Sequence, residues 1–410
     1  MAVPFAVTTR RVAAALATAV LGMATAANAT AAPGLSAAPR KPPAALYGSA
    51  DPTYDGVWRQ STALLALHAA GVTPAREAVA WLAGQQCADG GFAAYRADTG
   101  KPCDAKTEDV NSTALAVQAL TALGGHQDTV HRATGYLTSI RHADHGWGFQ
   151  PKAPTDANST AVVIGALAAA GAPDPRAVTA LRAFQIDCDT KGAQAADRGA
   201  FAYQPAPSGA LAANDKATAD AAFALLGKGY LLTAPATDRA PKPFSCPGGH
   251  GDASAAADAA SAYLTDKLTK GGGHLTAAQP GSDQRTPDYG TTADAVLALA
   301  AGGHLTAART TYDWLAKNAT SWAKGNPAAL GSLVLAAGAV GSSPHDAHGT
   351  DLVRELTALG PRPAAATPSA APEQASAKSG GVPVWWFVGA GLAAGAGIGW
   401  VLSFRNRKRR

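Results

Sequence analysis

Stretches with helical periodicity alternate between two kinds along residues 54–359. One kind is apolar on almost every side, as in Val110–Leu123, and the other has one apolar stripe, as in Pro74–Gln86. A helix of the first kind is buried, and a helix of the second kind packs on one face only. The predicted buried helices are Trp58–Ala70, Val110–Leu123, Asn158–Ala170, Asp215–Leu226, Thr291–Ala301 and Pro327–Ala339. The predicted half-buried helices are Pro74–Gln86, Thr129–Arg141, Asp174–Gln185, Ala253–Thr269, Thr306–Lys317 and Asp351–Leu359.

Each pair of helices leaves an apolar face that the pair cannot cover by itself. Repeat units of this kind need neighbours on both sides. Six such pairs therefore predict an all-α fold, an (α/α)6 toroid of six inner and six outer helices spanning residues 54–359.

Short polar residues precede the predicted inner helices. Four aspartates each stand three residues before a Ser or Thr, which is a pattern typical of a helix N-cap. We expect these carboxylates to have lowered pKa values, because they would accept hydrogen bonds from backbone N–H groups. The inner helices would all begin at one end of the ring, so these residues are either caps alone or a polar rim around an apolar pocket. The candidate rim comprises Trp58, Asp109, Asn111, Asp156, Asn158, Asp215, Asp288 and Tyr289.

Both ends of the chain predict export and anchoring. Arg10 and Arg11 precede an apolar run and small residues, so we predict a signal peptide over residues 1–32, followed by a linker over residues 33–53. Val384–Phe404 is apolar apart from Ser403 and has about the 20 residues that a transmembrane helix needs. The basic tail at residues 405–410 follows it, which predicts a single-pass type I protein with the toroid outside the cell. An Ala-, Pro- and Ser-rich stalk over residues 360–383 would connect the two.

Charge and cysteine content agree with an exported protein. Seven of the 34 Lys and Arg residues lie in the signal peptide and the tail, which leaves 27 against 29 Asp and Glu. This near-neutral balance argues against a nucleic-acid partner. Four cysteines in an exported chain predict two disulfides rather than a metal site. Three pairings are possible, and their positions favour Cys87 with Cys103 and Cys188 with Cys246.

Residues 81–92 carry a resemblance to a known family. Trp81-Leu82, Gln86 and Gly90-Gly91-Phe92 resemble the Gln-Trp repeat of the squalene-cyclase and protein-prenyltransferase superfamily. Later units keep only part of the pattern, and Arg141 stands where Gln is expected. The resemblance implies an α/α toroid. The inner-helix openings are also similar to those of cobalamin-carrier toroids.

The chemical signatures of these enzymes are missing. The sequence has no Asp-x-Asp-Asp tetrapeptide of the cyclases, and Asp187-Cys188-Asp189 has the wrong spacing for the prenyltransferase zinc site. We therefore assign no catalytic residue, metal or cofactor. The sequence favours a cell-surface toroid that binds a partner protein or an apolar or amphipathic small molecule, of terpenoid, polyprenyl or corrinoid-like type. The alternatives are an exported cyclase-like or prenyltransferase-like enzyme with a diverged active site, and a structural envelope protein.

Overall fold

The structure is a computed structural model, and it describes residues 43–246, 251–279 and 284–363. The predicted signal peptide, transmembrane helix and basic tail lie outside these residues. In the described part of the chain, no helix has the length and apolar character needed to cross a bilayer.

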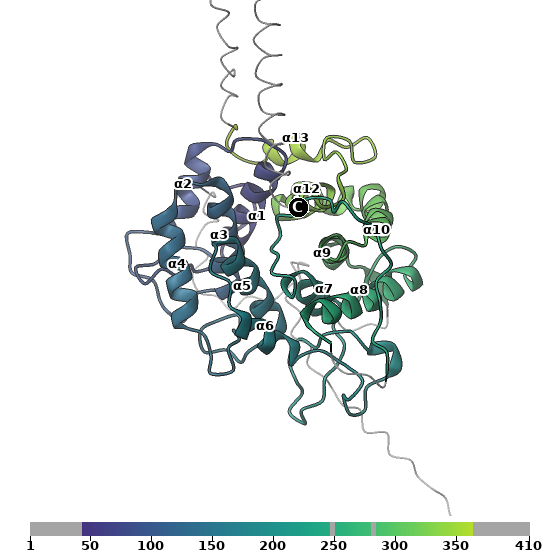
Figure 1. Ribbon diagram of the computed structural model, residues 1–410. Coiled ribbons are helices and arrows are strands. Elements are labelled where there is room, and N and C mark those ends of the chain that lie inside the picture. Colours follow the sequence, from purple (N-terminus) through teal and green to yellow (C-terminus); the bar gives the residue numbers. More distant parts are fainter. Residues whose placement is uncertain (1–42, 247–250, 280–283, 364–410) are drawn as a thin grey trace, which may run out of the picture. The chain divides into compact units, whose positions relative to one another are not determined.

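The inner helices form a closed ring (Figure 1). Each of them packs against the next along the chain, and the last, α12, packs against the first, α1. Their buried residues surround the helix on almost every side, as the apolar composition requires. The inner helices are α1 (Gly56–Ala69), α3 (Val110–Leu123), α5 (Ala157–Ala169), α7 (Asp215–Ala224), α9 (Tyr289–Ala301) and α12 (Pro327–Val340).

An outer helix packs on each inner helix. The outer helices bury few residues and keep a polar face, as in α4, where Ala133, Tyr136 and Leu137 are the buried side chains. The chain therefore has the predicted all-α, α/α toroid fold, with all twelve predicted inner and outer helices present. The outer helices are α2 (Arg76–Gly84), α4 (Gln127–Ser139), α6 (Pro175–Arg182), α8 (Ala253–Lys270), α10 (Leu305–Asn318) and α13 (Leu352–Thr357).

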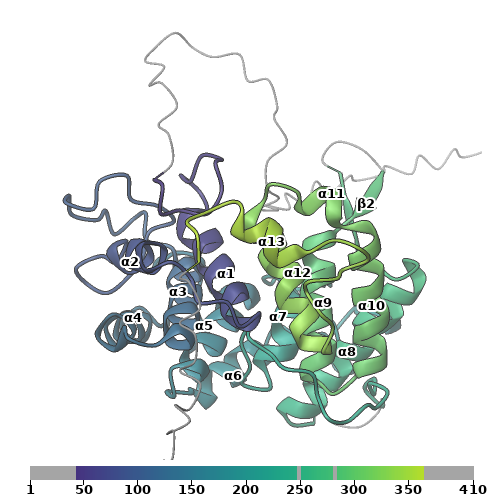
Figure 2. The same cartoon turned by 90° about the horizontal axis from the view of Figure 1, so that it is seen from above.

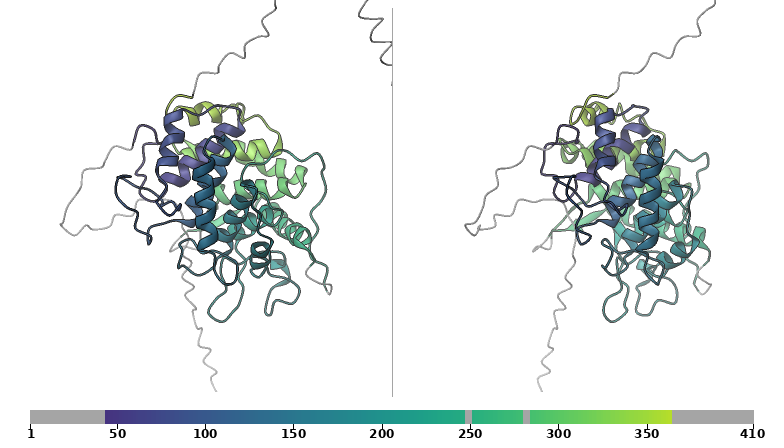
Figure 3. Two further views of the ribbon diagram at one scale, coloured as in Figure 1. Left: turned by 60° about the vertical axis from the view of Figure 1, so that its left-hand side comes forward. Right: turned by 90° about the vertical axis from the view of Figure 1, so that its left-hand side faces the viewer.

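Four small elements were not predicted. The 3₁₀ turn η1 (Ala195–Asp197) lies in the loop before α7, one of the teal loops that extend beyond the helices in Figure 3. Strands β1 (Thr276–Ala278) and β2 (Arg285–Pro287) pair antiparallel directly before α9. The short helix α11 (Thr320–Ala323) lies near β2, as Figure 2 shows.

The Gln of the repeat ties consecutive units together. The Gln185 side-chain amide donates to the carbonyl oxygens of Gly199, at 3.1 Å, and of Ala256 on the next outer helix, at 2.9 Å. Gln86 makes the same pair of bonds, to Gly90 and to Thr129 on α4. In the second unit Arg141 stands in place of this Gln. It forms an ion pair with Asp174, the N-cap of α6. The departure from the repeat thus keeps its structural role.

Threonines at equivalent positions hold the turns that enter the inner helices. The hydroxyl of Thr113 accepts a hydrogen bond from the buried N–H of Phe92 at 2.9 Å. Thr160, Thr218 and Thr292 do the same for Trp147, Phe201 and Leu275. Each Thr stands four residues after the N-cap, which fixes the register of four inner helices.

The two disulfides join Cys87 to Cys103 and Cys188 to Cys246, as predicted, with Cα atoms 5.7 Å apart in both. The core also extends into the segment predicted as a linker. Tyr47 is fully buried, and its N–H donates to the Gln60 side chain.

Candidate functional site

The N-caps define equivalent positions on the inner helices. Asp109, Asp156 and Asp288 cap α3, α5 and α9, as predicted. The prediction for Asp215 is wrong, because Asn214 is the N-cap of α7 and accepts from the Ala217 N–H. The spacing of Asp215 to Thr218 suggested that Asp215 is the N-cap, but Asn214, one position earlier, has this role.

The capping carboxylates accept hydrogen bonds from backbone N–H groups of their own helices. Asp156 is fully buried and accepts from the N–H and hydroxyl of Ser159 at 2.7 and 2.9 Å. Burial raises its pKa to about 6, and burial also raises the pKa of Asp109. The expectation of lowered pKa values is wrong for these two aspartates, because desolvation outweighs the hydrogen bonds from backbone N–H groups.

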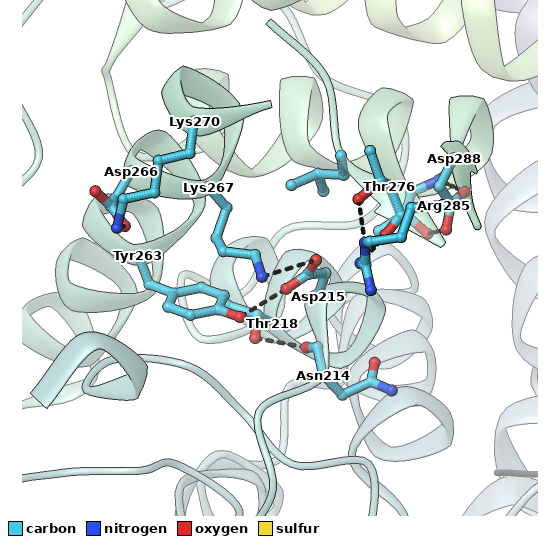
Figure 4. Close-up of polar contacts among 12 residues, drawn as sticks. Asn214, Asp215, Thr218, Tyr263, Asp266, Lys267, Lys270, Thr276, Arg285 and Asp288 are labelled. Carbon is cyan, nitrogen blue, oxygen red and sulfur yellow. Dashed lines mark hydrogen bonds and ion pairs between the residues drawn. The ribbon is translucent and has the colours of Figure 1, made fainter. Parts of the chain in front are cut away.

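Asp215 belongs to a cluster with the outer helix α8 (Figure 4). The Tyr263 hydroxyl donates to Asp215 at 2.6 Å, and Lys267 Nζ lies 3.8 Å from its other oxygen. These contacts join α7 to α8. Asp215 is therefore part of the helix packing rather than of the ring interior.

The residues two positions after the caps occupy equivalent places in the first turns of four inner helices. They are Asn111, Asn158, Lys216 and Gly290. Asn158 on α5 donates through Nδ2 to Asp220 on α7 at 2.9 Å. This contact places the first turn of one inner helix beside the second turn of the next, so these helices run in parallel around the ring.

Lys216 holds two aspartates from neighbouring helices. Its Nζ lies 2.6 Å from both Asp220 oxygens and 3.2 Å from Asp294 Oδ2. The Lys216 side chain is 40% exposed, Asp220 is 1% exposed and Asp294 is 12% exposed, so solvent reaches the cluster from one side. We call Asn158, Lys216, Asp220 and Asp294 the ring cluster.

Burial and charge oppose each other in the ring cluster. Burial alone would lower the pKa of Lys216, but the carboxylates of Asp220 and Asp294 raise it well above its usual value. Burial raises the pKa of Asp294 to about 6, although the Lys216 ammonium acts to lower it. At neutral pH the Lys216 ammonium is charged and the Asp294 carboxyl group is largely ionised.

Two amide oxygens in the first turns of α3 and α5 lack partners. Asn111 Oδ1 and Asn158 Oδ1 are buried atoms without a hydrogen bond in the described structure. The assignment of Asn158 is determined by its neighbour, because only Nδ2 can donate to the Asp220 carboxylate. A buried acceptor without a partner costs about 1–3 kcal/mol. A ligand that brings hydrogen-bond donors would satisfy it.

Aromatic side chains take the corresponding place near α9. Gly290 has no side chain, and a Cβ there would lie 3.9 Å from the Trp322 ring of α11. Trp322 stacks on Tyr289 at 5.5 Å, and Tyr289 stacks on Trp314 at 5.7 Å. The side chains of Tyr289, Trp314 and Trp322 are all half-buried.

A loop closes the ring below the cluster. Tyr230, in the connection from α7 to α8, packs edge-on against Trp58 with their ring centroids 6.1 Å apart. The Tyr230 residue is only 6% exposed. Its N–H donates to Gln118 Oε1 of α3 at 2.9 Å. Gly229 is required beside it, because a Cβ would lie 2.2 Å from the same oxygen. Trp58 thus packs inside the ring, and Asp55 stands at the N-cap position of α1.

The predicted rim therefore separates into several groups. Asn158 belongs to the ring cluster, and Trp58 packs inside the ring. Asp109, Asp156 and Asp288 cap helices, and Asp215 and Tyr289 contact the outer helices α8 and α10. Asn111 lies in the first turn of α3. Lys216, Asp220, Asp294 and Trp322 were missed. The signal for the first three was present, because they are the charged residues of otherwise Ala-rich inner helices and Asp220 and Asp294 both stand six residues after a cap.

The described residues offer one close group of potential metal ligands, Cys87, Cys103 and Glu108. Both sulfurs belong to a disulfide, so neither can bind as a thiolate. Two surface cavities, of about 660 and 440 Å³, are lined by other residues than the ring cluster. The larger lies at α10, beside Asp313, Trp314 and Lys317.

Comparison with known proteins gives structural similarity only. No protein-family model matches the chain, and no curated protein matches it. One similar solved structure is an ent-copalyl diphosphate synthase from Streptomyces platensis, with a TM-score of 0.47 and 17% identity over 70% of this chain. The alignment spans 50% of that protein, so this chain covers about half of its length. Another is a protein from Actinoplanes, with a TM-score of 0.46 and 16% identity over 73% of this chain and 80% of that one. The fold assignment rests on the helix contacts.

Proposed function

We propose that this chain is a non-catalytic binding protein that holds an amphipathic small molecule at the end of the ring where the inner helices begin. The observation that carries the proposal is the pairing of two surfaces at this end. The ring cluster and Asn111 present polar atoms on α3, α5, α7 and α9. Trp58, Tyr289 and Trp322 present half-buried aromatic rings on α1, α9 and α11.

Such a surface suits a molecule with both an apolar body and a polar group. Aromatic side chains contribute large apolar contact areas, and a few placed polar groups orient a ligand. Terpenoid, polyprenyl and corrinoid-like molecules all carry apolar surface, and the corrinoid type also carries many amide donors. A partner protein that inserts one side chain would use the same two surfaces.

The proposed location is the outer face of the cell membrane. Two disulfides support an oxidising compartment. The apolar run at residues 384–404 and the basic residues after it support a single C-terminal anchor. The binding site would then face the extracellular side.

A cyclase-like enzyme is the second candidate, because Asp294 is a buried carboxyl group with a raised pKa. Alkene protonation requires an acid that holds its proton at working pH. With a pKa of about 6, Asp294 has lost most of its proton at neutral pH, and Lys216 at 3.2 Å favours the ionised form. This geometry favours binding over acid catalysis.

Extraction of bound small molecules tests the proposal. The full chain, exported by a related host and held in lipid nanodiscs, is denatured, and the released compounds are identified by mass spectrometry. We expect one compound at near-stoichiometric amount, and its loss in the double variant Trp58→Ala and Trp322→Ala.

The matched control is Trp81→Ala on the outer helix α2, where Trp81 stacks on Tyr95 at 6.4 Å. This variant removes a similar aromatic contact away from the ring and should retain the compound. Equal amounts from all three proteins, or none from the wild type, would argue against a ring ligand and favour a structural role.

A further inference from the structure

The ring cluster has more negative than positive charge. Lys216 directs its ammonium to both oxygens of Asp220 and to Asp294 Oδ2, which uses its three N–H donors. In the described part of the chain, Asp294 Oδ1 has no hydrogen-bond or ion-pair partner. The Asp294 side chain is nevertheless 12% exposed, so this oxygen is close to solvent.

Two further buried polar atoms near the ring cluster lack a hydrogen-bond partner in the described structure. They are Asn158 Oδ1, on the residue that donates to Asp220, and the hydroxyl oxygen of Tyr230, which interacts electrostatically with Asp220, Lys216 and Asp294. Buried charge is stable when it is both paired and hydrogen-bonded, and a removed partner is costly. By formal charge the ring cluster therefore lacks one positive group.

We propose that the ligand carries a cationic nitrogen, a protonated amine or guanidinium, that pairs with Asp294 inside the ring. The inference rests on the proposed binding function and names the chemical class of its ligand. Two ammonium-type groups would then alternate with two carboxylates across α7 and α9.

An anionic ligand fits less well, because the Lys216 ammonium is already paired with Asp220 and Asp294. A divalent metal ion also fits poorly, because the Lys216 ammonium lies 3.2 Å from Asp294 and would repel a doubly charged ion. A nitrogen cation brings one charge and its own hydrogen-bond donors, and it requires only one free carboxylate oxygen.

Matched naphthalene probes test the charge requirement. The full chain in nanodiscs is titrated by calorimetry with 2-naphthylmethylamine, 2-naphthylmethanol and 2-naphthoate at pH 7.5. We expect the amine to bind at least tenfold more tightly than the alcohol, and the carboxylate to bind least. Asp294→Asn should remove the preference for the amine while it retains binding of the alcohol.

Asp266→Asn is the control variant. Asp266 lies on the exposed face of α8, paired with Lys270 at 2.6 Å, so its loss changes the net charge equally without touching the ring. It should leave the tenfold preference intact.

A pH series on the wild type provides a measurement that needs no variant. The groups that act on Asp294 are Lys216, Asp220 and Tyr230, together with Asp288 at the start of its own helix. As the pH falls from 7.5 to 5, protonation of Asp294 should weaken amine binding several-fold and leave alcohol binding unchanged.

The outcomes separate this inference from the proposed function. Equal affinity for amine and alcohol, or no saturable binding of the amine, would overturn the cationic class. A compound released from the wild type but not from the double tryptophan variant would still support binding in the ring. An extracted compound that is neutral or anionic would uphold the function and contradict its assigned class.

Discussion

Asp156 changes character because the ring buries it completely. An exposed capping carboxylate is stabilised by the helix N-terminus, which lowers its pKa. At Asp156 desolvation is the larger effect. The pKa rises to about 6 although hydrogen bonds from Ser159, Phe149 and Tyr203 act to lower it. The same competition acts at Asp294, where a lysine replaces the backbone donors.

Replacement of Asp156 by Asn should reveal this effect as a change in pH dependence. A carboxyl group with a folded pKa above its unfolded value of 3.8 stabilises the fold while protonated, and loses that contribution as the pH rises toward 6. Asparagine keeps a capping oxygen and does not titrate. Relative to Asp156→Asn, the wild type should therefore lose roughly 1–3 kcal/mol of unfolding free energy between pH 4 and 7.

Urea unfolding of both proteins across this pH range measures the difference. Asp266→Asn, on an exposed face, serves as the control and should follow the wild type. A wild-type advantage that grows toward neutral pH would show that the Asp156 pKa is lowered instead.

At the scale of elements, the turns before α3 and α7 depend on close backbone contact with the neighbouring outer helix. Gly199 has φ of +95°, and a Cβ at this residue would lie 2.3 Å from the Ala259 carbonyl oxygen of α8. Gly90 makes the equivalent approach to Arg132 of α4, with φ of +102°. The Gln side chains of Gln86 and Gln185 bridge the same interfaces.

Two glycine variants distinguish the close approach from backbone strain alone. Gly209→Ala introduces only strain, because φ is +80° and no atom lies within 4 Å of the new Cβ, so it should cost about 1 kcal/mol. Gly199→Ala adds the collision with α8 and should cost about 2–4 kcal/mol. Thermal or urea unfolding measures both, and equal losses would show that helix α8 moves away without cost.

At the scale of the whole molecule, the described chain is joined by contacts between distant residues. Helix α12 packs on α1, and a Cβ at Gly331 would lie 2.8 Å from the Thr62 side chain, so the two helices meet closely. The connection from α7 to α8 passes the ring at Tyr230 and reaches Cys246. The Cys188–Cys246 disulfide thus fastens a segment that also packs against the inner helices at Tyr230.

The two disulfides should differ in their contribution to stability. Cys188 and Cys246 are 58 residues apart, and Cys87 and Cys103 are 16 apart. Since the constraint on the unfolded chain grows with loop length, the double variant Cys188→Ala and Cys246→Ala should lose about 1 kcal/mol more than Cys87→Ala and Cys103→Ala. Urea unfolding under oxidising conditions compares them, and a larger loss for the shorter loop would contradict the expectation.

The sequence by itself determined the helices, their order and their closure into a ring. Apolar and amphipathic periods, caps such as Asp109 and turns such as Gly90-Gly91-Phe92 are local signals, and the described helices follow them. The β1–β2 hairpin and α11 escaped prediction because three or four residues carry too little periodicity.

The tertiary structure alone decided which polar residues meet. Asp215 and Lys216 are neighbours in sequence, yet one contacts α8 and the other faces the ring, because successive helical residues point about 100° apart. The pairing of Lys216 with Asp294 depends on the register between α7 and α9, which packing and the Thr218 and Thr292 hydrogen bonds set. Local sequence has no information on that register, so the candidate site emerged only when the ring was closed.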